Sequence, residues 1–349
     1  MDVRDDLREL VEAAEHHDDA AYHEWMSQRG LGDGLPVIRP TSVRLESMLD
    51  GQAADEELGV LPPLMRPTSV ADVAVVALLA GCNRDALPWV ATAIRGIAVP
   101  EFNLLGVSTT TGNVAVYVAL HGPGAARLRA NAGSGCLAPG NRSNATIGRA
   151  VALSLQLLAG AAPGTIDMAT IGQPAKFGAC FAEGDPPGSW NALSVERGVE
   201  PSRSAVTVLA ASSVVEAVDG LSQTGEGLLE TLATAMVQPA GLSGDRTCLG
   251  GGEQFVLMPP EWATMLQTQG WSKADVRSFL LDRTQIPVDR LSPSLREHLA
   301  AEVRMRGVIP SAKQAEDIVI FVTGGPGTKC THLMSWPGGT QSVTLALAP

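Results

Sequence analysis

The chain has 349 residues, of which 45% are hydrophobic and 18% are charged, and its formal net charge is -12. This composition predicts a soluble globular protein with one large or two medium domains, and its acidity argues against nucleic acid or an anionic membrane as the main partner. No apolar run is long enough to span a bilayer, and the charged N-terminus has no apolar signal region, so we expect a cytoplasmic protein.

The five cysteines are odd in number and far apart, and no two of them form a C-x-x-C pair. This pattern signals neither a disulfide framework nor a zinc knuckle. The metal-binding spacings H-x-x-x-H and H-E-x-x-H are also absent, so no metal is predicted. His16, His17 and His23 lie in a segment rich in acidic residues, where a solvated helix face is a simpler interpretation than a metal site.

Residues 1–40 read as a helical segment that ends in a turn-rich, extended piece. Apolar residues at helical spacing, each run preceded by a capping residue, then predict helices from Ser42 to Leu49, from Val70 to Ala80 and from Asp85 onward. Between the first two of these helices, Leu61 to Pro67 reads as a proline-marked link.

The next elements occur twice in the order helix, loop, strand, helix. The strand of the first copy spans 114–120 and that of the second spans 254–258. The separation from Pro100 to Gly112 equals the separation from Pro239 to Gly251. We interpret the match as a degenerate internal duplication, and chance similarity is the alternative because this order of elements is common.

The fold that follows is α/β or α+β, with two similar helix–loop–strand–helix halves and mixed sheets covered by helices. The expected parts are an N-terminal helical segment, 1–40, a first half, 41–200, and a second half, 201–349. A cleft between two such halves is a favoured place for a small-molecule site.

A small-residue loop with one thiol, Cys136, runs directly into a predicted helix that Ser143 or Asn144 would cap. The free N–H groups of the helix start and the nearby Arg142 favour an anion site. Such surroundings lower a cysteine pKa and make the thiol nucleophilic. The alternative is a tight turn packed around a buried, inert cysteine.

Two glycine- or threonine-rich loops occupy equivalent places in the two halves and would line the opposite wall of the cleft. They contain Thr109, Thr110, Thr111 and Asn113 in the first half, and Gly251, Gly252 and Glu253 in the second. Ordinary strand chemistry for the threonines and a strand-initiating turn for the glycines are the alternatives. Lys176, next to Phe177, suits a clamp for an anion or a carbonyl group, and a solvated lysine is its alternative.

No established catalytic template fits the sequence. It lacks a G-x-S-x-G elbow, and the glycine run 324–327 lacks the lysine ending of a phosphate-binding loop, so no nucleotide or other cofactor is predicted. What remains is a thiol with candidate acid–base partners, since an imidazole near a thiolate is the usual activated pair. These candidates are His121, Glu183, Glu253 and His332.

Motifs cover almost the whole chain from residue 30. They are G-D-G-L-P-V-I-R-P-T (32–41), L-L-A-G-C (78–82), G-S-G-C (133–136) with N-A-T-I-G-R-A (144–150), D-M-A-T-I-G-Q-P-A-K (167–176), C-F-A-E (180–183), G-G-G-E (250–253), G-W-S-K-A-D-V-R (270–277) and V-T-G-G-P-G (322–327). They resemble those of a largely uncharacterised bacterial family, whose members are similar to proteins encoded beside small UGSC-motif selenoproteins or their cysteine forms. By association, the resemblance implies redox- or thiol-linked chemistry on a small molecule. The chain departs from the family after its cysteine, at Leu137, Ala138 and Asn141, which implies a different substrate.

We therefore expect a metabolic enzyme of lyase or hydrolase type, rather than an oxidoreductase, that cleaves or eliminates at a carbon–heteroatom bond of a small anionic substrate. The expected catalytic residues are Cys136, His121, Lys176 and Glu253. The expected substrate-binding residues are Thr109, Thr110, Thr111, Asn113, Arg142, Asn144, Gly251, Gly252 and His332. The alternative is a non-catalytic subunit of a thiol- or selenol-dependent redox complex, whose small partner protein carries the reactive cysteine or selenocysteine. A homo-oligomer is compatible with either interpretation.

Overall fold

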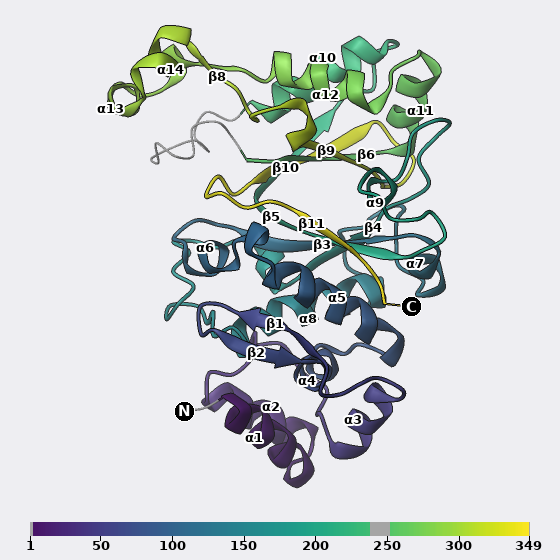
Figure 1. Ribbon diagram of the computed structural model, residues 1–349, viewed down its shortest axis with the longest axis vertical. Helices are drawn as coiled ribbons and strands as arrows, with labels where there is room; N and C mark the ends of the chain where they lie inside the picture. Colours follow the sequence, from purple (N-terminus) through teal and green to yellow (C-terminus); the bar gives the residue numbers. More distant parts are fainter. Residues whose placement is uncertain (1–2, 238–251, 349) are drawn as a thin grey trace.

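The computed structural model describes residues 3–237 and 252–348, which form an elongated α/β protein (Figure 1). The N-terminal helices lie at one end of the long axis, a curled sheet lies near the middle, and helices of the C-terminal half lie toward the other end. Mixed strands covered by helices confirm the fold class that the sequence predicts.

Seven strands form the central sheet in the order β4-β3-β5-β10-β6-β9, and β11 also pairs with β5. Their bounds are β3 Ala115–His121, β4 Ala179–Ala182, β5 Ala205–Val218, β6 Gln254–Met258, β9 Ile318–Val322, β10 Lys329–Ser335 and β11 Val343–Ala346. The β3–β4 and β6–β9 pairs are parallel, and the other pairs are antiparallel. The first part of the 14-residue β5 pairs with β3 and β11, and its second part pairs with β10. This one long strand therefore joins the two halves of the sheet.

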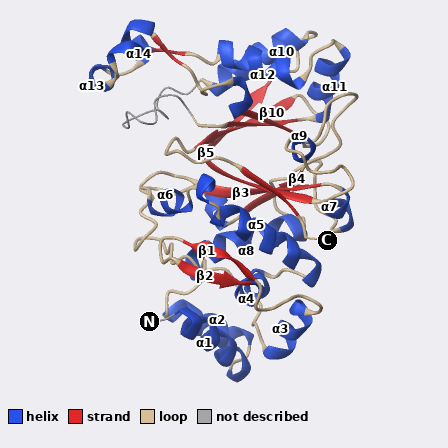
Figure 2. Cartoon of the chain, in the orientation of Figure 1, coloured by secondary structure: helices blue, strands red, loops and turns tan. Residues whose placement is uncertain are grey.

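Helices cover the outer face of each half of the sheet, as Figure 2 shows. On the first half these are α5 Leu87–Ala98 and α8 Arg142–Leu157, with α4 Val70–Ala80 packed behind them, and on the second half α10 Gly225–Met236, α11 Pro260–Thr268 and α12 Lys273–Arg283. Side chains alternate along each strand, so Val116 and Val118 pack toward the helices while Tyr117 points to the opposite face. That inner face holds a third apolar cluster to which both halves contribute, including Phe181 and Phe255.

The edge strands β4 and β9 come together at their C-terminal ends. The Gly184 N–H donates to the Val322 carbonyl at 2.8 Å, and the Thr323 hydroxyl donates to the Ala182 carbonyl at 2.8 Å. Phe181 and Phe321 meet edge to face, with ring centroids 5.2 Å apart. The sheet thus curls around the inner cluster until its two edges touch.

The two halves share one order of elements. The first half runs α5, β3, α8, β4, β5, and the second runs α10, β6, α12, β9, β10. In each half the second strand is parallel to the first, and the third is antiparallel to it. This arrangement is what an internal duplication would produce, and the duplication itself stays a prediction.

The remaining elements surround this framework. They are α1 Val3–His16, α2 Asp19–Gln28, α3 Ser42–Leu49, β1 Glu57–Leu61, β2 Arg66–Ser69, α6 Leu104–Thr109, α7 Pro123–Arg127, α9 Leu193–Glu196, β7 Ile286–Pro287, α13 Pro293–His298, α14 Ala301–Arg306 and β8 Val308–Ile309. The helices 42–49 and 70–80 have the predicted bounds, and Ser69 begins the second of them with a capping box closed by Asp72. The expected link at 61–67 is wrong in part, because Leu61 and Arg66 pair as the end of a β1–β2 hairpin.

Within the described residues, no single helix is long and apolar enough to cross a membrane. The pair 84–98 and 100–109 reaches that length only with a bend of 74° between its members. The apolar α5, which belongs to this pair, is mostly buried against the sheet.

Close packing of α8 on β4 depends on Gly148. A Cβ at Gly148 would lie 2.8 Å from the backbone nitrogen of Ala179, and backbone atoms cannot move aside as side chains can. We expect Gly148→Ala to lower the free energy of unfolding by about 2 kcal/mol in urea denaturation, although alanine is the better helix former by about 1 kcal/mol.

Gly96→Ala in α5 is the matched control. The nearest atom to its Cβ is a methyl group of Val208 at 2.9 Å, which belongs to a side chain and can shift. The loss should therefore be smaller by about 1 kcal/mol. Equal losses at the two positions would contradict the proposed backbone contact.

Candidate functional site

A pocket of about 590 Å³ lies beside the short 3-10 helix η3, Pro174–Phe177, which leads into β4. Its volume is within the range of small-molecule sites. The lining residues are Gly32, Asp33, Gln156, Pro163, Gly164, Asp167, Ala169, Ile171, Gly172, Gln173, Pro174, Lys176 and Phe177. Two segments that the sequence singles out as motifs, 32–41 and 167–176, therefore meet at this pocket.

Lys176 and Asp167 form an ion pair on the pocket wall. The Lys176 ammonium donates to Oδ2 of Asp167 at 2.5 Å, and the two side chains are 24% and 17% exposed. The Ala169 N–H donates to the other carboxylate oxygen at 3.1 Å, which fixes the Asp167 side chain. An ammonium has three donors, so a partly exposed Lys176 retains donors for a ligand.

Gln173 attaches η3 to the sheet. Its amide nitrogen donates to the Ala211 carbonyl at 2.8 Å and to the Asn113 carbonyl, and its amide oxygen accepts from the Tyr117 hydroxyl at 3.3 Å. These contacts reach β5, the loop before β3, and β3 itself. Lys176, three residues further along, therefore projects from an anchored turn.

The other carboxylate of the pocket, Asp33, is fully engaged. Arg149 of α8 donates to both of its oxygens, at 2.7 and 2.9 Å. Burial opposes ionisation of Asp33, but the hydrogen bonds from Arg149 and from the Leu35 N–H outweigh this effect and lower its pKa. Asp33 thus holds the 32–36 segment on α8, and Lys176 and Asp167 form the second ion pair of the pocket wall.

The loop that contains Thr109 to Asn113 contacts the segment 167–176, which lines the pocket, through a backbone carbonyl and an asparagine side chain rather than through threonine hydroxyls. The Thr170 N–H donates to the Thr111 carbonyl at 3.0 Å, and the Gly172 N–H donates to Oδ1 of Asn113 at 3.0 Å. The hydroxyls of Thr109 and Thr110 bond within their own turn. Thr111 and Asn113 thus support the segment 167–176, and none of the four residues lines the pocket.

The surroundings of Cys136 differ from the expected ones. Asn141, rather than Ser143 or Asn144, caps α8, and the exposed Arg142 donates twice to the Gly81 carbonyl, at 3.0 and 3.2 Å. Asn144 is buried and donates to the Cys136 carbonyl at 3.0 Å, so it holds the loop in place.

The Cys136 thiol itself is buried, and burial raises its pKa, which contradicts the expected lowering. Cys136 belongs to the inner apolar cluster and does not line the pocket at Lys176. Its catalytic role stays a prediction that the geometry does not support.

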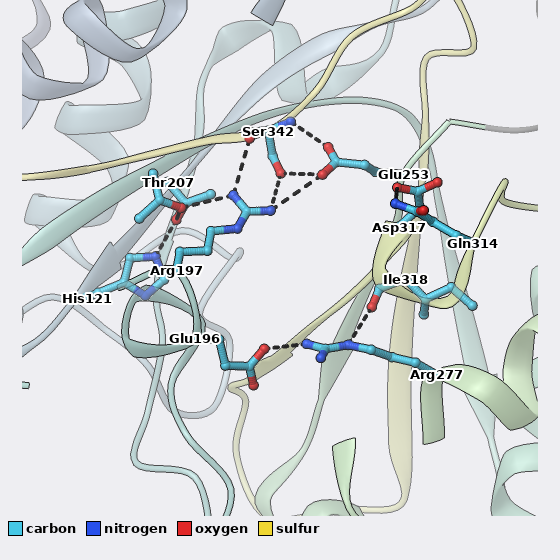
Figure 3. A network of polar contacts seen from close by, with 11 residues as sticks. His121, Glu196, Arg197, Thr207, Glu253, Arg277, Gln314, Asp317, Ile318 and Ser342 are labelled. Atoms are coloured by element: carbon cyan, nitrogen blue, oxygen red, sulfur yellow. Dashed lines mark hydrogen bonds and ion pairs between the residues drawn. The ribbon is translucent and has the colours of Figure 1, made fainter. Parts of the chain in front are cut away.

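His121 and Glu253 belong to one buried polar network, which Figure 3 shows. Nδ1 of His121 lies 2.8 Å from Oε2 of Glu183, and its Nε2 lies 2.7 Å from the Thr207 hydroxyl. Thr207 then contacts the Thr344 hydroxyl at 2.7 Å. The His121 ring is fully buried, so this part of the network lies inside the sheet.

Arg197 continues the network to Glu253. It donates to the hydroxyls of Thr344 and Ser342 at 2.9 and 2.7 Å, and its guanidinium lies 3.4 Å from Oε1 of Glu253. The Ser342 hydroxyl also donates to that oxygen, at 2.8 Å. Burial lowers the pKa of Arg197 and raises that of Glu253, although each opposite charge partly offsets the shift. Glu253 also borders a second pocket of about 660 Å³, with Asp317.

His332, Gly251 and Gly252 are the remaining expected site residues, and neither His332 nor Gly252 is among the residues that line the pocket at Lys176. His332 projects from β10, and its Nε2 lies 2.7 Å from Oε1 of Gln254. Burial lowers the pKa of His332 to about 4. A Cβ at Gly252 would lie 2.9 Å from the Ser335 hydroxyl, whereas Gly251 lies outside the described residues.

The structure thus separates residues that the sequence analysis groups together. Lys176 lines one pocket, His121 and Glu253 share a buried network, and Cys136 lies in an apolar cluster. Asp167, the partner of Lys176, is nine residues earlier at the other end of the same motif, a signal that could have found it. Arg197 has no comparable signal, because its partners come from distant segments.

Comparisons with known proteins supply no relative for this chain. No protein-family model matches it, and searches of curated proteins and of solved structures find no match. The function is therefore argued from the residues and their contacts.

Removing Arg197 should destabilise the protein by leaving Glu253 buried without its cation. We expect Arg197→Met to lower the free energy of unfolding by about 3 kcal/mol at pH 7. Burial already raises the pKa of Glu253, so acidification should protonate this carboxylate first and reduce the loss. Adding Glu253→Gln to Arg197→Met should recover part of the stability. Urea denaturation at pH 5 and pH 7 checks this, and a loss that does not change with pH would contradict it.

The buried His332 should make stability depend on pH. Its pKa is about 4 in the folded state and 6.5 in the unfolded reference, so between these values only the unfolded chain takes up the proton. Stability should therefore fall by about 3 kcal/mol as the pH drops from 6.5 to 4. His332→Gln should remove this part of the pH dependence in denaturation curves, whereas His16→Gln, at an exposed position, should retain it.

Proposed function

We propose that the chain is a small-molecule enzyme whose active site is the pocket at Lys176 and Asp167. Lys176 would bind a carboxylate or carbonyl oxygen of a small anionic metabolite. The reaction would be cleavage or elimination at a carbon–heteroatom bond, which places the enzyme with the lyases or hydrolases. The observation that carries the proposal is the partly exposed Lys176–Asp167 pair on the wall of a ligand-sized pocket.

The pair suits the chemistry of an elimination next to a carbonyl group. Loss of a proton from the carbon beside the carbonyl places negative charge on the carbonyl oxygen, and the Lys176 ammonium would stabilise that charge. The Asp167 carboxylate, 2.5 Å from the ammonium, would take the proton while the leaving group departs with its electron pair. Ile171, Pro174 and Phe177 line the same pocket and give it an apolar wall.

The second candidate is the non-catalytic subunit of a thiol- or selenol-dependent complex. It is supported by three large apolar side chains that project into solvent from the pocket segment. Met168 is 50% exposed, Ile171 87% and Phe177 53%, and exposed apolar residues gathered on one segment are typical of a docking surface. Under this candidate, Met168→Asp, at an exposed position that does not line the pocket, would abolish association with a small cysteine or selenocysteine protein. In the proposed enzyme, the same substitution would leave turnover within about threefold.

We propose the cytoplasm as the compartment. In the described part of the chain, all the cysteines are free and buried, which suits a reducing environment. They are Cys82, Cys136, Cys180 and Cys330.

Binding measurements test the proposed site. A panel of small carboxylates and oxo acids would be screened by thermal shift, and the affinity of each hit would be measured by calorimetry. We expect Lys176→Met to weaken binding of a hit by about 100-fold, since a desolvated charged hydrogen bond is lost. Asp167→Asn should leave binding within about threefold but lower turnover by about 100-fold.

Lys313→Met, at the pocket beside Glu253, is the matched control and should bind the hit as the wild type does. The Lys176→Met protein should also remain folded, because methionine keeps the length of the side chain and Asp167 retains the hydrogen bond from the Ala169 N–H. A circular dichroism spectrum checks this. Unchanged affinity in Lys176→Met would exclude this pocket as the active site.

A further inference from the structure

A narrow cavity of about 100 Å³ adjoins the pocket at Lys176. The two share Gln156, Pro163, Asp167 and Lys176 as lining residues. The cavity extends between α6, the start of β3 and α8, where it is lined mainly by Val107, Val114, Val116, Ala152, Leu155 and Ala161. A group attached to a ligand at Lys176 would therefore enter an apolar space.

Ser108 contributes the one hydroxyl among the residues that line this cavity. Its side chain is buried, with the residue only 4% exposed, and its Oγ has no hydrogen-bond partner among the described residues. A serine in a helix often bonds the carbonyl four residues earlier, as the neighbouring Thr109 does with Leu105 at 2.8 Å. Ser108 does not make this bond, so its hydroxyl is left without a protein partner inside an apolar cavity.

An unpartnered buried hydroxyl is unfavourable, at about 1–3 kcal/mol, and such groups are rare in folded proteins. A ligand atom that bonds Ser108 would remove this penalty in the complex. The cavity is smaller than the engineered apolar cavity of about 150 Å³ that holds benzene in another protein, so it has room for about three or four non-hydrogen atoms.

We propose that this cavity is the specificity pocket of the site at Lys176 and that Ser108 is its specificity-determining residue. The substrate is then a short-chain carboxylic acid whose carboxylate meets Lys176. Its chain of a few carbons enters the cavity and carries a hydroxyl or oxo group that bonds Ser108. The inference rests on the proposed function, and it adds the substrate class.

The test uses pairs of acids that differ only in the distal oxygen. The probes are butanoate and pentanoate, their 4-hydroxy and 4-oxo derivatives, and acetate, which is too short to reach the cavity. Calorimetry would measure each dissociation constant with the wild type, Ser108→Ala, Ala152→Leu and Lys176→Met. The wild type should prefer an oxygenated acid over its parent by at least about tenfold.

Ser108→Ala should lose this preference and bind the parent acids as the wild type does. Ala152→Leu, which fills the cavity, should weaken the four- and five-carbon acids by at least about tenfold and leave acetate unchanged. Lys176→Met should weaken all the acids, including acetate. If the ratio of the dissociation constants for the oxygenated and parent acids is the same in Ser108→Ala and the wild type, the inference is overturned. If in that case Lys176→Met still loses binding of all the acids, the proposed function stands although the inference has failed. If none of the acids binds the wild type at millimolar concentration, both proposals fail.

A measurement without ligand is also decisive. Because Ser108 has no partner, Ser108→Ala should keep or slightly raise the melting temperature. Ser154→Ala in α8 is the matched control, since that buried hydroxyl donates to the Ala150 carbonyl at 2.8 Å, and its loss should lower the melting temperature by a few degrees. A similar fall in both variants would show that Ser108 is bonded within the protein and would overturn the inference.

Discussion

A buried carboxylate, Glu183, ties together the two edges of the curled sheet. It follows β4, and its oxygens accept from the Val322 N–H at the end of β9, at 3.4 Å, and from the Leu193 N–H at 2.9 Å. The same side chain contacts His121 at the end of β3. A carboxylate this deeply buried is tolerated only when its lone pairs are occupied, so the closed sheet and the network inside it depend on each other.

The sequence was a good guide to local structure and a poor one to long-range contacts. Helices 42–49 and 70–80 are set by their own apolar spacing and caps, and both have the predicted bounds. The β1–β2 hairpin was missed because its prolines were read as a break, although the Pro67 position pairs with Val60. The helix–strand order was also readable, whereas the closure between β4 and β9 depends on the curl of the sheet, which no local pattern encodes.

In the candidate site, too, the sequence pointed to single residues but not to the distant segments that surround them. Lys176 could be found because a lysine in a glycine-broken segment stands out, but its pocket forms only when the 32–36 segment docks on Arg149. Cys136 attracted attention for its small-residue loop and the helix after it. Whether such a thiol is exposed and activated depends on what covers it, and here residues of distant strands bury it. Sequence motifs thus located the segments, and only packing decided which side chains face a cavity.

The position of β11 has a consequence for how the chain is made. This strand, near the C-terminal end of the described residues, pairs with the first part of β5, which belongs to the sheet of the first half. During synthesis β5 therefore emerges long before β11. Until β11 is present, the backbone N–H and C=O groups on this side of β5 have no strand partner. Contacts so far apart in sequence form late and slow folding. The nascent first half thus exposes this strand edge until β11 has been synthesised.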